Sequence, residues 1–317
     1  MTRESTIQPF QKGDILIGCT LLNDPDDDHA GDGRILQYDN DFNEKGVLWT
    51  QGTDHLVGGL TFGPDGNLWA FDSNAHTVIR VSPQGVQLPE IKFAERAFSN
   101  CCFAPDGTVL MGEHLVGNTI KLPPERPLGT TLSKIPGTDR FGDGHVFRFT
   151  LDGELIREYQ TASNGGMTGF LGVTCTSLAA DGRTLVYCSE TGRHVYQYDI
   201  EADRQLPDLI THEPDSKSIA LMIRHRQDGS LLYVMASFET GFALQHLSPD
   251  GEVLRNYPLP GRGWATVATT ADPDIVLITN FFTGTATKMS LNSGEMIGPE
   301  VQTGVERSAA GIVEYAG

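Results

Sequence analysis

The chain has 317 residues, and its 23 Lys and Arg against 41 Asp and Glu give a formal net charge of -18. This charge argues against nucleic acid and anionic membrane surfaces as partners, because phosphate contacts need clustered cations. No stretch approaches the ~20 apolar residues of a membrane span, the N-terminus lacks the apolar run of a signal peptide, and the five cysteines form no disulfide framework. We therefore expect a cytoplasmic protein.

Short strands separated by glycine and proline turns are expected along the whole chain. The first three cover residues 14–18, 33–38 and 47–49. A turn phrase, Phe-Gly-Pro-Asp-Gly-Asn-Leu-Trp at 62–69, then recurs at 103–110, 179–185 and 226–232, with a degenerate copy at 271–277. Each Asp-Gly is typical of a tight hairpin turn, and the flanking runs have the length and composition of strands. Helical periodicity is absent.

Third strands follow these hairpins at 77–81, 145–149, 194–198 and 243–247. Four antiparallel strands in about 40–45 residues are typical of a propeller blade. Five blades are expected to begin near Val57, Ser99, Gly172, Ser218 and Gly263. The sixth is split, because its innermost strand would come from residues 309–315 at the C-terminus.

The sequence therefore predicts an all-β, six-bladed β-propeller closed by the C-terminal strand, as a single domain over residues 1–317. Seven blades is the alternative, since residues 115–144 form an extra segment rich in proline and glycine. That segment is interpreted either as a surface loop or as a lid over one mouth of the channel.

Candidate site residues come from the ends of the second strands, which face one mouth of such a channel. They are Asp72, Glu113 with His114, Glu190, Glu239 and Asn280. Carboxylates that converge in a narrow funnel repel one another, so they must be protonated, paired with cations or bound to a metal. Oxygen ligands favour Ca²⁺, Mg²⁺ or Mn²⁺, and such a cation would polarise a carbonyl.

The metal-free alternative makes a carboxylate or His114 the general acid or base. Asn100, Asn280 and Arg193 would then hold the substrate, and the exposed Phe238 and Phe281 would suit a flat apolar molecule.

Several of these residues also have structural interpretations. Asp72 would brace its own loop, and Glu190 would pair with Arg193 in a strand-connecting turn. The loop at 23–33, with five Asp, is either a solvated acidic loop or a loop that holds calcium. The cysteines are expected to pack in the hydrophobic core, because no Cys-x-x-Cys spacing typical of a zinc site occurs.

Residues 176–199, TSLAADGRTLVYCSETGRHVYQYD, are similar to the "SPDGKTLYVAETGxxRIxRYD" pattern of the gluconolactonase/regucalcin and strictosidine synthase-like superfamily of six-bladed propellers, and to NHL-type repeats generally. Residues 63–72 also resemble a repeat of virginiamycin B lyase, a seven-bladed propeller.

The first resemblance implies one divalent cation at the channel mouth, Ca²⁺, Mg²⁺, Mn²⁺ or Zn²⁺. In that family an early Glu, a mid-chain Asn and an Asp hold it. Here Glu190 stands at the Asp position and Glu306 is the candidate for the early Glu, with Asp72 as a further ligand; no Asn occupies the mid-chain position. Asn100 resembles a substrate-side Asn of the family.

The leading functional expectation is a small-molecule enzyme, a metal-assisted hydrolase of lactone or ester type. A lyase, isomerase or cyclase that uses Glu113, His114 and Glu190 without metal is the alternative within enzymes. A non-catalytic propeller that binds a peptide or protein is the alternative outside them. Neither the substrate nor the oligomeric state can be predicted from the sequence.

Overall fold

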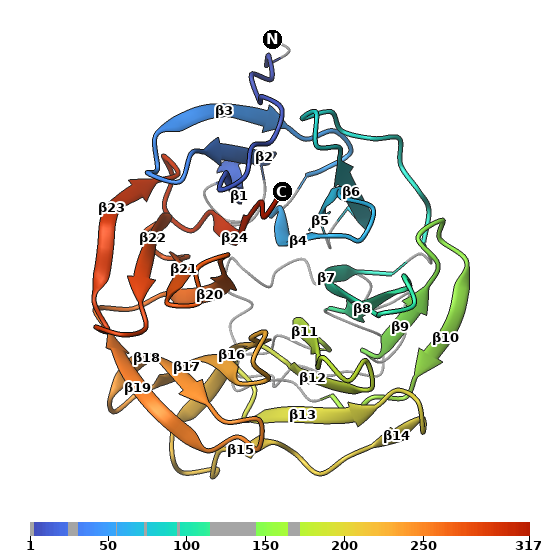
Figure 1. The fold of residues 1–317 in the computed structure, drawn as a ribbon, viewed down its shortest axis with the longest axis vertical. Coiled ribbons are helices and arrows are strands. Elements are labelled where there is room, and N and C mark those ends of the chain that lie inside the picture. The colour runs from blue at the N-terminus through green and yellow to red at the C-terminus, as the bar shows by residue number, and fades with distance from the viewer. Residues whose placement is uncertain are drawn as a thin grey trace. The chain divides into compact units, whose positions relative to one another are not determined.

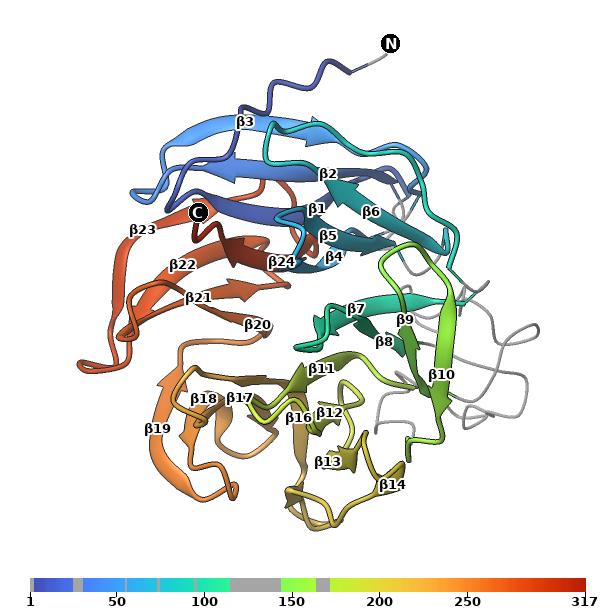
Figure 2. The ribbon, with the colours of Figure 1, turned by 45° about the vertical axis from the view of Figure 1, so that its right-hand side comes forward.

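The structure is a computed structural model that describes residues 3–24, 31–54, 56–72, 75–93, 96–114, 144–163 and 172–317. These residues form twenty-four strands and no helix, and the strands make six antiparallel sheets (Figure 1 and Figure 2). The fold is all-β, a six-bladed β-propeller, and six blades rather than seven are confirmed. No helix among the described residues is long and apolar enough to cross a membrane.

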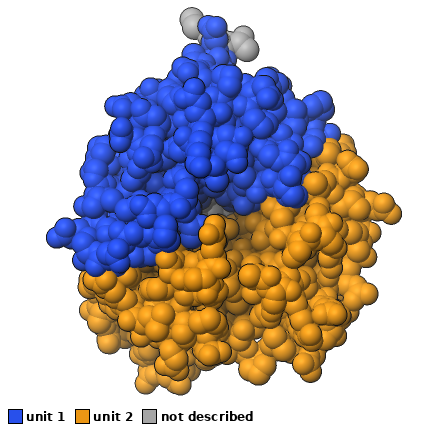
Figure 3. Space-filling view, viewed as in Figure 1, with its two compact units in different colours: residues 1–90, 263–317 blue, residues 91–262 orange. Residues whose placement is uncertain are grey.

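The chain divides into two compact units (Figure 3), residues 1–90 with 263–317 and residues 91–262. Each unit holds three blades. The blades of the first unit are β24 (Ala309–Glu314), β1 (Ile15–Leu22), β2 (Gly31–Tyr38) and β3 (Glu44–Trp49); β4 (Gly58–Phe62), β5 (Leu68–Asp72) and β6 (Thr77–Val81); and β20 (Trp264–Thr269), β21 (Ile275–Asn280), β22 (Thr285–Ser290) and β23 (Met296–Gln302).

The C-terminal strand completes the blade that opens the chain, as predicted. β24 pairs antiparallel with β1, with Ile312 opposite Ile17 (Figure 2). Along β1 the side chains alternate between two buried clusters: Ile17 packs in the cluster that contains Leu277 of β21, and Leu16 packs in the one that contains Leu60 of β4. Both faces of this sheet are therefore buried between neighbouring blades of the unit, which is why β1 is an almost continuous apolar run.

The second unit has the same organisation. Its blades are β7 (Phe98–Phe103), β8 (Val109–Glu113), β9 (Val146–Phe149) and β10 (Leu155–Tyr159); β11 (Cys175–Leu178), β12 (Thr184–Cys188), β13 (His194–Asp199), β14 (Arg204–Gln205) and β15 (Ile210–Thr211); and β16 (Ser218–His225), β17 (Leu231–Ser237), β18 (Gly241–Leu247) and β19 (Val253–Leu259). Buried clusters join the first blade to the second and the second to the third.

The repeated Asp-Gly phrase forms the turn between the first and second strands of four blades. In the β7–β8 turn, the Asp106 carboxylate accepts the Thr108 N–H at 3.1 Å, and Gly107 has φ 83°. The β11–β12 turn repeats this arrangement with Asp181, Gly182 and Arg183. Aspartate closes the turn through its side chain and glycine accepts the left-handed conformation, so the phrase sets the position of each second strand.

Asp199, at the end of β13, makes the stability of the fold depend on pH. Its carboxylate accepts two bonds from Arg183, at 2.9 and 2.6 Å, and one from the Ala202 N–H at 2.8 Å. These interactions, the Arg183 hydrogen bond first, lower its pKa from 3.8 to about 2. A carboxyl with a depressed folded-state pKa stabilises the fold above its unfolded pKa, and this contribution is lost as pH falls through the folded value.

We therefore expect Asp199→Asn to lower the melting temperature near neutral pH. The difference from wild type should shrink as pH falls from about 4 to about 2, where the wild-type carboxyl also becomes protonated. Thermal melts across this range measure the effect, with the exposed Asp215→Asn as control. A difference that stays constant down to pH ~2 would contradict the assignment.

Candidate functional site

The predicted site residues divide between the two units (Figure 3). The second unit holds Asn100, Glu113, His114, Glu190, Arg193 and Phe238, and the first holds Asp72, Asn280, Phe281 and Glu306. The geometry within each unit decides which of them act together.

Glu113, the last residue of β8, is the centre of a charged cluster in the second unit. Its side chain has no exposed surface. Arg96 Nη1 lies 3.0 Å from Oε1, and the Gly144 N–H donates to Oε2 at 3.0 Å. Both carboxylate oxygens therefore have a charged or polar donor, which is what allows a carboxylate to be buried. With both oxygens engaged, Glu113 fixes the Arg96 guanidinium in place rather than facing solvent itself.

Arg96 was not among the residues predicted from the sequence. It precedes β7, in a segment without a motif, and its side chain is 24% exposed. The guanidinium lies 4.9 Å from the centre of the Phe147 ring, a cation–π contact that restrains it further. A guanidinium held on two sides and open on another is suited to binding an anion or a developing oxyanion.

His145, immediately before β9, lies opposite Glu113. The Glu113 N–H donates to the His145 carbonyl at 2.9 Å, so the two residues lie opposite each other and their side chains share a face of the sheet. His145 Nδ1 lies 2.7 Å from Glu158 Oε1, and both side chains are partly exposed. A carboxylate bound at Nδ1 orients the ring and leaves Nε2 to accept or donate a proton.

This face of the β7–β10 blade therefore carries a guanidinium fixed by one carboxylate and an imidazole oriented by another. The next blade repeats only the second part, because His194 at the start of β13 pairs with Asp208 at 2.8 Å. The Arg96–Glu113 pair distinguishes the β7–β10 blade from the β11–β15 blade.

His114 is placed differently from the prediction that groups it with Glu113. Successive side chains of a strand point to opposite faces, so its ring leaves the face that Glu113 occupies. Its N–H donates to the Ala97 carbonyl at 2.6 Å, it forms an isolated bridge with Gly172, and both ring nitrogens are buried. The structure thus pairs Glu113 with Arg96 and His145 on one face.

Asn100 connects two blades of the second unit. Its amide donates to the Val173 carbonyl at 3.1 Å, and its oxygen accepts the Thr176 hydroxyl at 2.7 Å. The adjacent Gly112 leaves room for this contact, because a Cβ there would lie 2.8 Å from the Val173 carbonyl oxygen. In this structure the Asn100 side chain braces β7 against the segment that leads into β11.

Asn100→Ala is accordingly expected to lower the free energy of unfolding by about 1–3 kcal/mol, since two buried groups lose a partner. Urea unfolding of Asn100→Ala, Thr176→Val and the double variant measures the coupling between the two side chains. The exposed Asn256→Ala is the control. Unchanged stability with lost activity would instead favour the predicted role of Asn100 in substrate binding.

Glu190 lies in the turn after β12, at residues 189–192. Its N–H donates to Thr174 Oγ1 at 2.6 Å, and the Thr191 N–H donates to the Ala220 carbonyl of β16 at 2.7 Å. Thr191 has φ 64°, an unfavourable conformation for a β-branched residue. Arg193 accepts the His212 N–H through its carbonyl at 2.8 Å. This turn is held by the segment before β11 on one side and by β16 on the other.

Phe238, at the turn after β17, is 64% exposed, as predicted. Its role in substrate binding stays a prediction.

In the first unit, Asp72 is fully buried and links its own loop to the segment before β4. Its two oxygens accept the N–H groups of Asp54 and Ala75, at 2.8 and 3.0 Å. Asn280 likewise accepts the Thr283 N–H, at 3.2 Å. The loop-bracing interpretation therefore describes what both side chains do in this structure.

Phe281 and the exposed Phe282 lie together, with ring centres 6.1 Å apart. The Arg307 guanidinium lies 5.8 Å from the Phe282 ring, and Glu306 beside it is exposed. An aromatic and charged surface thus forms at the turns that flank β22 and β24.

The described residues do not assemble a metal centre. They contain no group of three or more His, Cys, Asp or Glu side chains that could hold a metal ion. The predicted ligands are divided between the two units, Asp72 and Glu306 in the first and Glu190 in the second, and their role as metal ligands stays a prediction. Most of the acidic loop at 23–33, and the predicted lid at 115–144 except Gly144, lie outside the described residues.

A pocket of about 360 Å³ lies in the first unit. It is lined by Gln51, Gly52, Thr77, Val78, Gln87, Leu88, Pro89 and Glu90. None of the predicted site residues lines it.

Comparisons with known proteins show the fold. No family model and no curated protein matches the chain. Among solved structures, a catalytically inactive His-to-Ala variant of virginiamycin B lyase from Staphylococcus aureus, with quinupristin, has a TM-score of 0.55 at 15% identity, over 97% of this chain and 91% of that one. A nidogen/laminin complex gives 0.61 at 14% identity, over 95% and 97%. A putative gluconolactonase gives 0.55 at 14% identity, over 87% and 88%.

These neighbours agree with the predicted resemblance to gluconolactonase-like propellers at the level of fold. They include proteins named as enzymes and a protein–protein complex, so the fold by itself does not select a function.

Proposed function

We propose that this chain is a small-molecule enzyme that performs acid–base chemistry on a carbonyl substrate at the β7–β10 blade. The observation that carries the proposal is the Arg96–Glu113 ion pair on the same face as the His145–Glu158 pair. Arg96 would stabilise the negative charge that develops on the substrate oxygen, and His145 Nε2 would accept or donate the proton.

Hydrolysis of a lactone or ester is the first form of this proposal. His145 would remove a proton from the attacking water, and Arg96 would stabilise the tetrahedral oxyanion. A metal-assisted version needs ligands beyond those that the described residues bring together, and elemental analysis of the purified protein tests it.

Elimination by a lyase is the second form. The same base would remove a proton next to a carbonyl, and Arg96 would stabilise the enolate. One structural neighbour supports this form. It is virginiamycin B lyase, in which a His-to-Ala variant is catalytically inactive.

The test is turnover of a panel of lactones, aryl esters and carbonyl compounds with a β leaving group. Arg96→Met and His145→Gln are expected to lower kcat/KM by about 10²–10³, the usual effect of removing an oxyanion donor or a general base. Arg157→Met is the matched control, because Arg157 lies on β10 of the same blade and its ion pair with Asp203 of the next blade is exposed on both sides.

Turnover that survives both substitutions would overturn the assignment of the site. Absence of turnover by wild type, with a protein partner recovered instead, would favour the binding function of propellers.

A further inference from the structure

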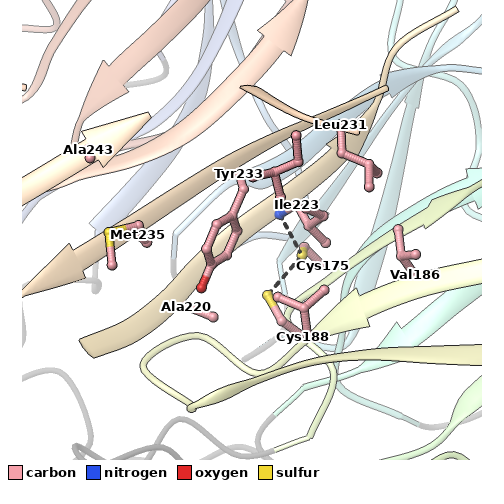
Figure 4. Close-up of a cluster of buried hydrophobic side chains, with 11 residues drawn as sticks. Cys175, Val186, Cys188, Ala220, Ile223, Leu231, Tyr233, Met235 and Ala243 are labelled. Atoms are coloured by element: carbon pink, nitrogen blue, oxygen red, sulfur yellow. Dashed lines mark hydrogen bonds between the residues drawn. The ribbon is translucent and has the colours of Figure 1, made fainter. Parts of the chain in front are cut away.

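Two buried cysteines in the second unit face each other at the end of a strand pair. Cys175 is the first residue of β11, Cys188 is the last of β12, and they are directly opposite in the antiparallel register. Their Sγ atoms lie 3.2 Å apart (Figure 4). Facing residues of antiparallel strands have Cα atoms about 4.5–5.5 Å apart, inside the ~4.4–6.8 Å range of disulfides. The backbone therefore needs no rearrangement for the two sulfurs to bond.

The surroundings of the pair differ for the two thiols. Cys175 Sγ accepts the Ile223 N–H of β16 at 3.4 Å, and Cys188 Sγ lies 3.8 Å from the Leu221 carbonyl oxygen (Figure 4 draws the first contact). The hydrogen bond from Cys188 lowers the pKa of Cys175, while that bond and burial raise the pKa of Cys188. The Ile223 N–H donated to Cys175 Sγ stabilises a thiolate there, so we take Cys175 as the nucleophile and Cys188 as the resolving thiol.

The other cysteines are unlike this pair. Burial raises the pKa of Cys19 and of Cys102 to about 11, which disfavours their thiolates. Cys101 is also buried and forms no disulfide. Reactivity should therefore concentrate at Cys175, and Cys188 is the thiol that faces it.

We propose that Cys175 and Cys188 are a dithiol site that peroxides oxidise to an intramolecular disulfide. The Cys175 thiolate attacks a peroxide oxygen and becomes a sulfenic acid, and the displaced oxygen leaves as water after taking up a proton. Cys188 sulfur then attacks the sulfenic sulfur and expels the second water. With hydrogen peroxide, two thiols and one peroxide give one disulfide and two waters, which balances atoms and electrons.

Access to the pair comes from its position at the end of the ladder. Cys175 is 3% exposed and Cys188 fully buried, so the oxidant reaches them when this end of the β11–β12 pair opens locally. The disulfide would then link the start of β11 to the end of β12, and β12 leads into the Glu190 turn.

The test treats the folded protein with hydrogen peroxide, blocks remaining thiols under denaturing conditions, and maps peptides by mass spectrometry without reduction. We expect a linked peptide pair containing Cys175 and Cys188, lighter by two hydrogens than the sum of the free peptides. Loss of these thiols should be roughly tenfold faster than loss of the Cys19 thiol. The melting temperature should rise by about 5 °C and return on reduction, as a bond that closes a short loop predicts.

Cys188→Ser separates the two steps. It should trap the Cys175 sulfenic acid, detected with a dimedone-type probe, and form no disulfide. Cys19→Ser is the matched control and should form the disulfide as wild type does. Free thiols at both positions after oxidation, linkage to Cys101 or Cys102, or a bond that forms only in urea would each overturn the proposal.

Discussion

Glu113→Ala is expected to lower the free energy of unfolding by about 2–4 kcal/mol. The substitution removes the acceptor of Arg96 Nη1 and of the Gly144 N–H, both at 3.0 Å. Arg96 keeps a side chain that is 24% exposed, so water replaces part of what it loses. This places the effect toward the lower end of the range for broken buried pairs.

Urea unfolding followed by circular dichroism measures the change. Glu239→Ala is the control, because its pair with Lys217 at 3.5 Å is exposed on both sides and should contribute less than about 1 kcal/mol. Glu113→Gln keeps the shape but places an amide donor against one of the two N–H donors, so it should be destabilising as well. Equal effects of Glu113→Ala and Glu239→Ala would contradict the role given to this ion pair.

Substitution of Glu113 also tests the proposed function, because Glu113 would act on catalysis by positioning Arg96. If Glu113 positions the guanidinium, Glu113→Gln should lower kcat while the protein is still folded. Arg96→Met should have a similar effect, and the double variant should lose little more than either one, because the two residues act as a unit.

The blade pattern could be predicted from the sequence because each turn carries its own chemistry. Asp106-Gly107 and Asp181-Gly182 form the same turn in two blades. In each, the carboxylate accepts a backbone N–H within the turn and the glycine adopts the positive φ. Local signals of this kind do not depend on the rest of the chain, and their spacing sets the number of blades. The split blade could also be predicted. The start of the chain supplies only three strands of the first blade, and an apolar run near the C-terminus has the length of the missing fourth strand.

The site could be predicted only in part, because it depends on pairings between distant residues. Glu113 could be found as a carboxylate at a strand end, but Arg96, His145 and Glu158 come from other segments and carry no motif. The face that a side chain occupies depends on register. A shift of one residue exchanges the faces of Glu113 and His114, and the sequence alone does not fix that register.

Asp72 and Asn100 show the converse. Both have the residue type and the strand position of functional groups, and in the structure both satisfy backbone or side-chain groups that would otherwise be buried without partners. Fully buried polar side chains must find partners, so a polar residue at a strand end is as often a structural brace as a ligand group.

Removal of the C-terminal strand is expected to have the largest effect of all: a chain that ends at Arg307 should not form a stable first unit. β24 covers one edge of β1 and contributes Ile312 to the buried cluster that contains Ile15, Ile17 and Leu277. Without it, the backbone donors and acceptors of β1 and several apolar side chains face solvent. An exposed, apolar strand edge of this kind promotes aggregation.

The measurement is the soluble fraction after expression, followed by thermal melting of what is soluble. Removal of Ala316 and Gly317 alone is the control, because both are exposed and lie beyond the end of β24 at Glu314. A synthetic peptide of residues 308–317, added to the truncated chain during refolding, should restore part of the melting transition, since the missing strand pairs through its own backbone. A truncated chain that melts like the control would show that β24 is dispensable, and would contradict the pairing of the two chain ends in one blade.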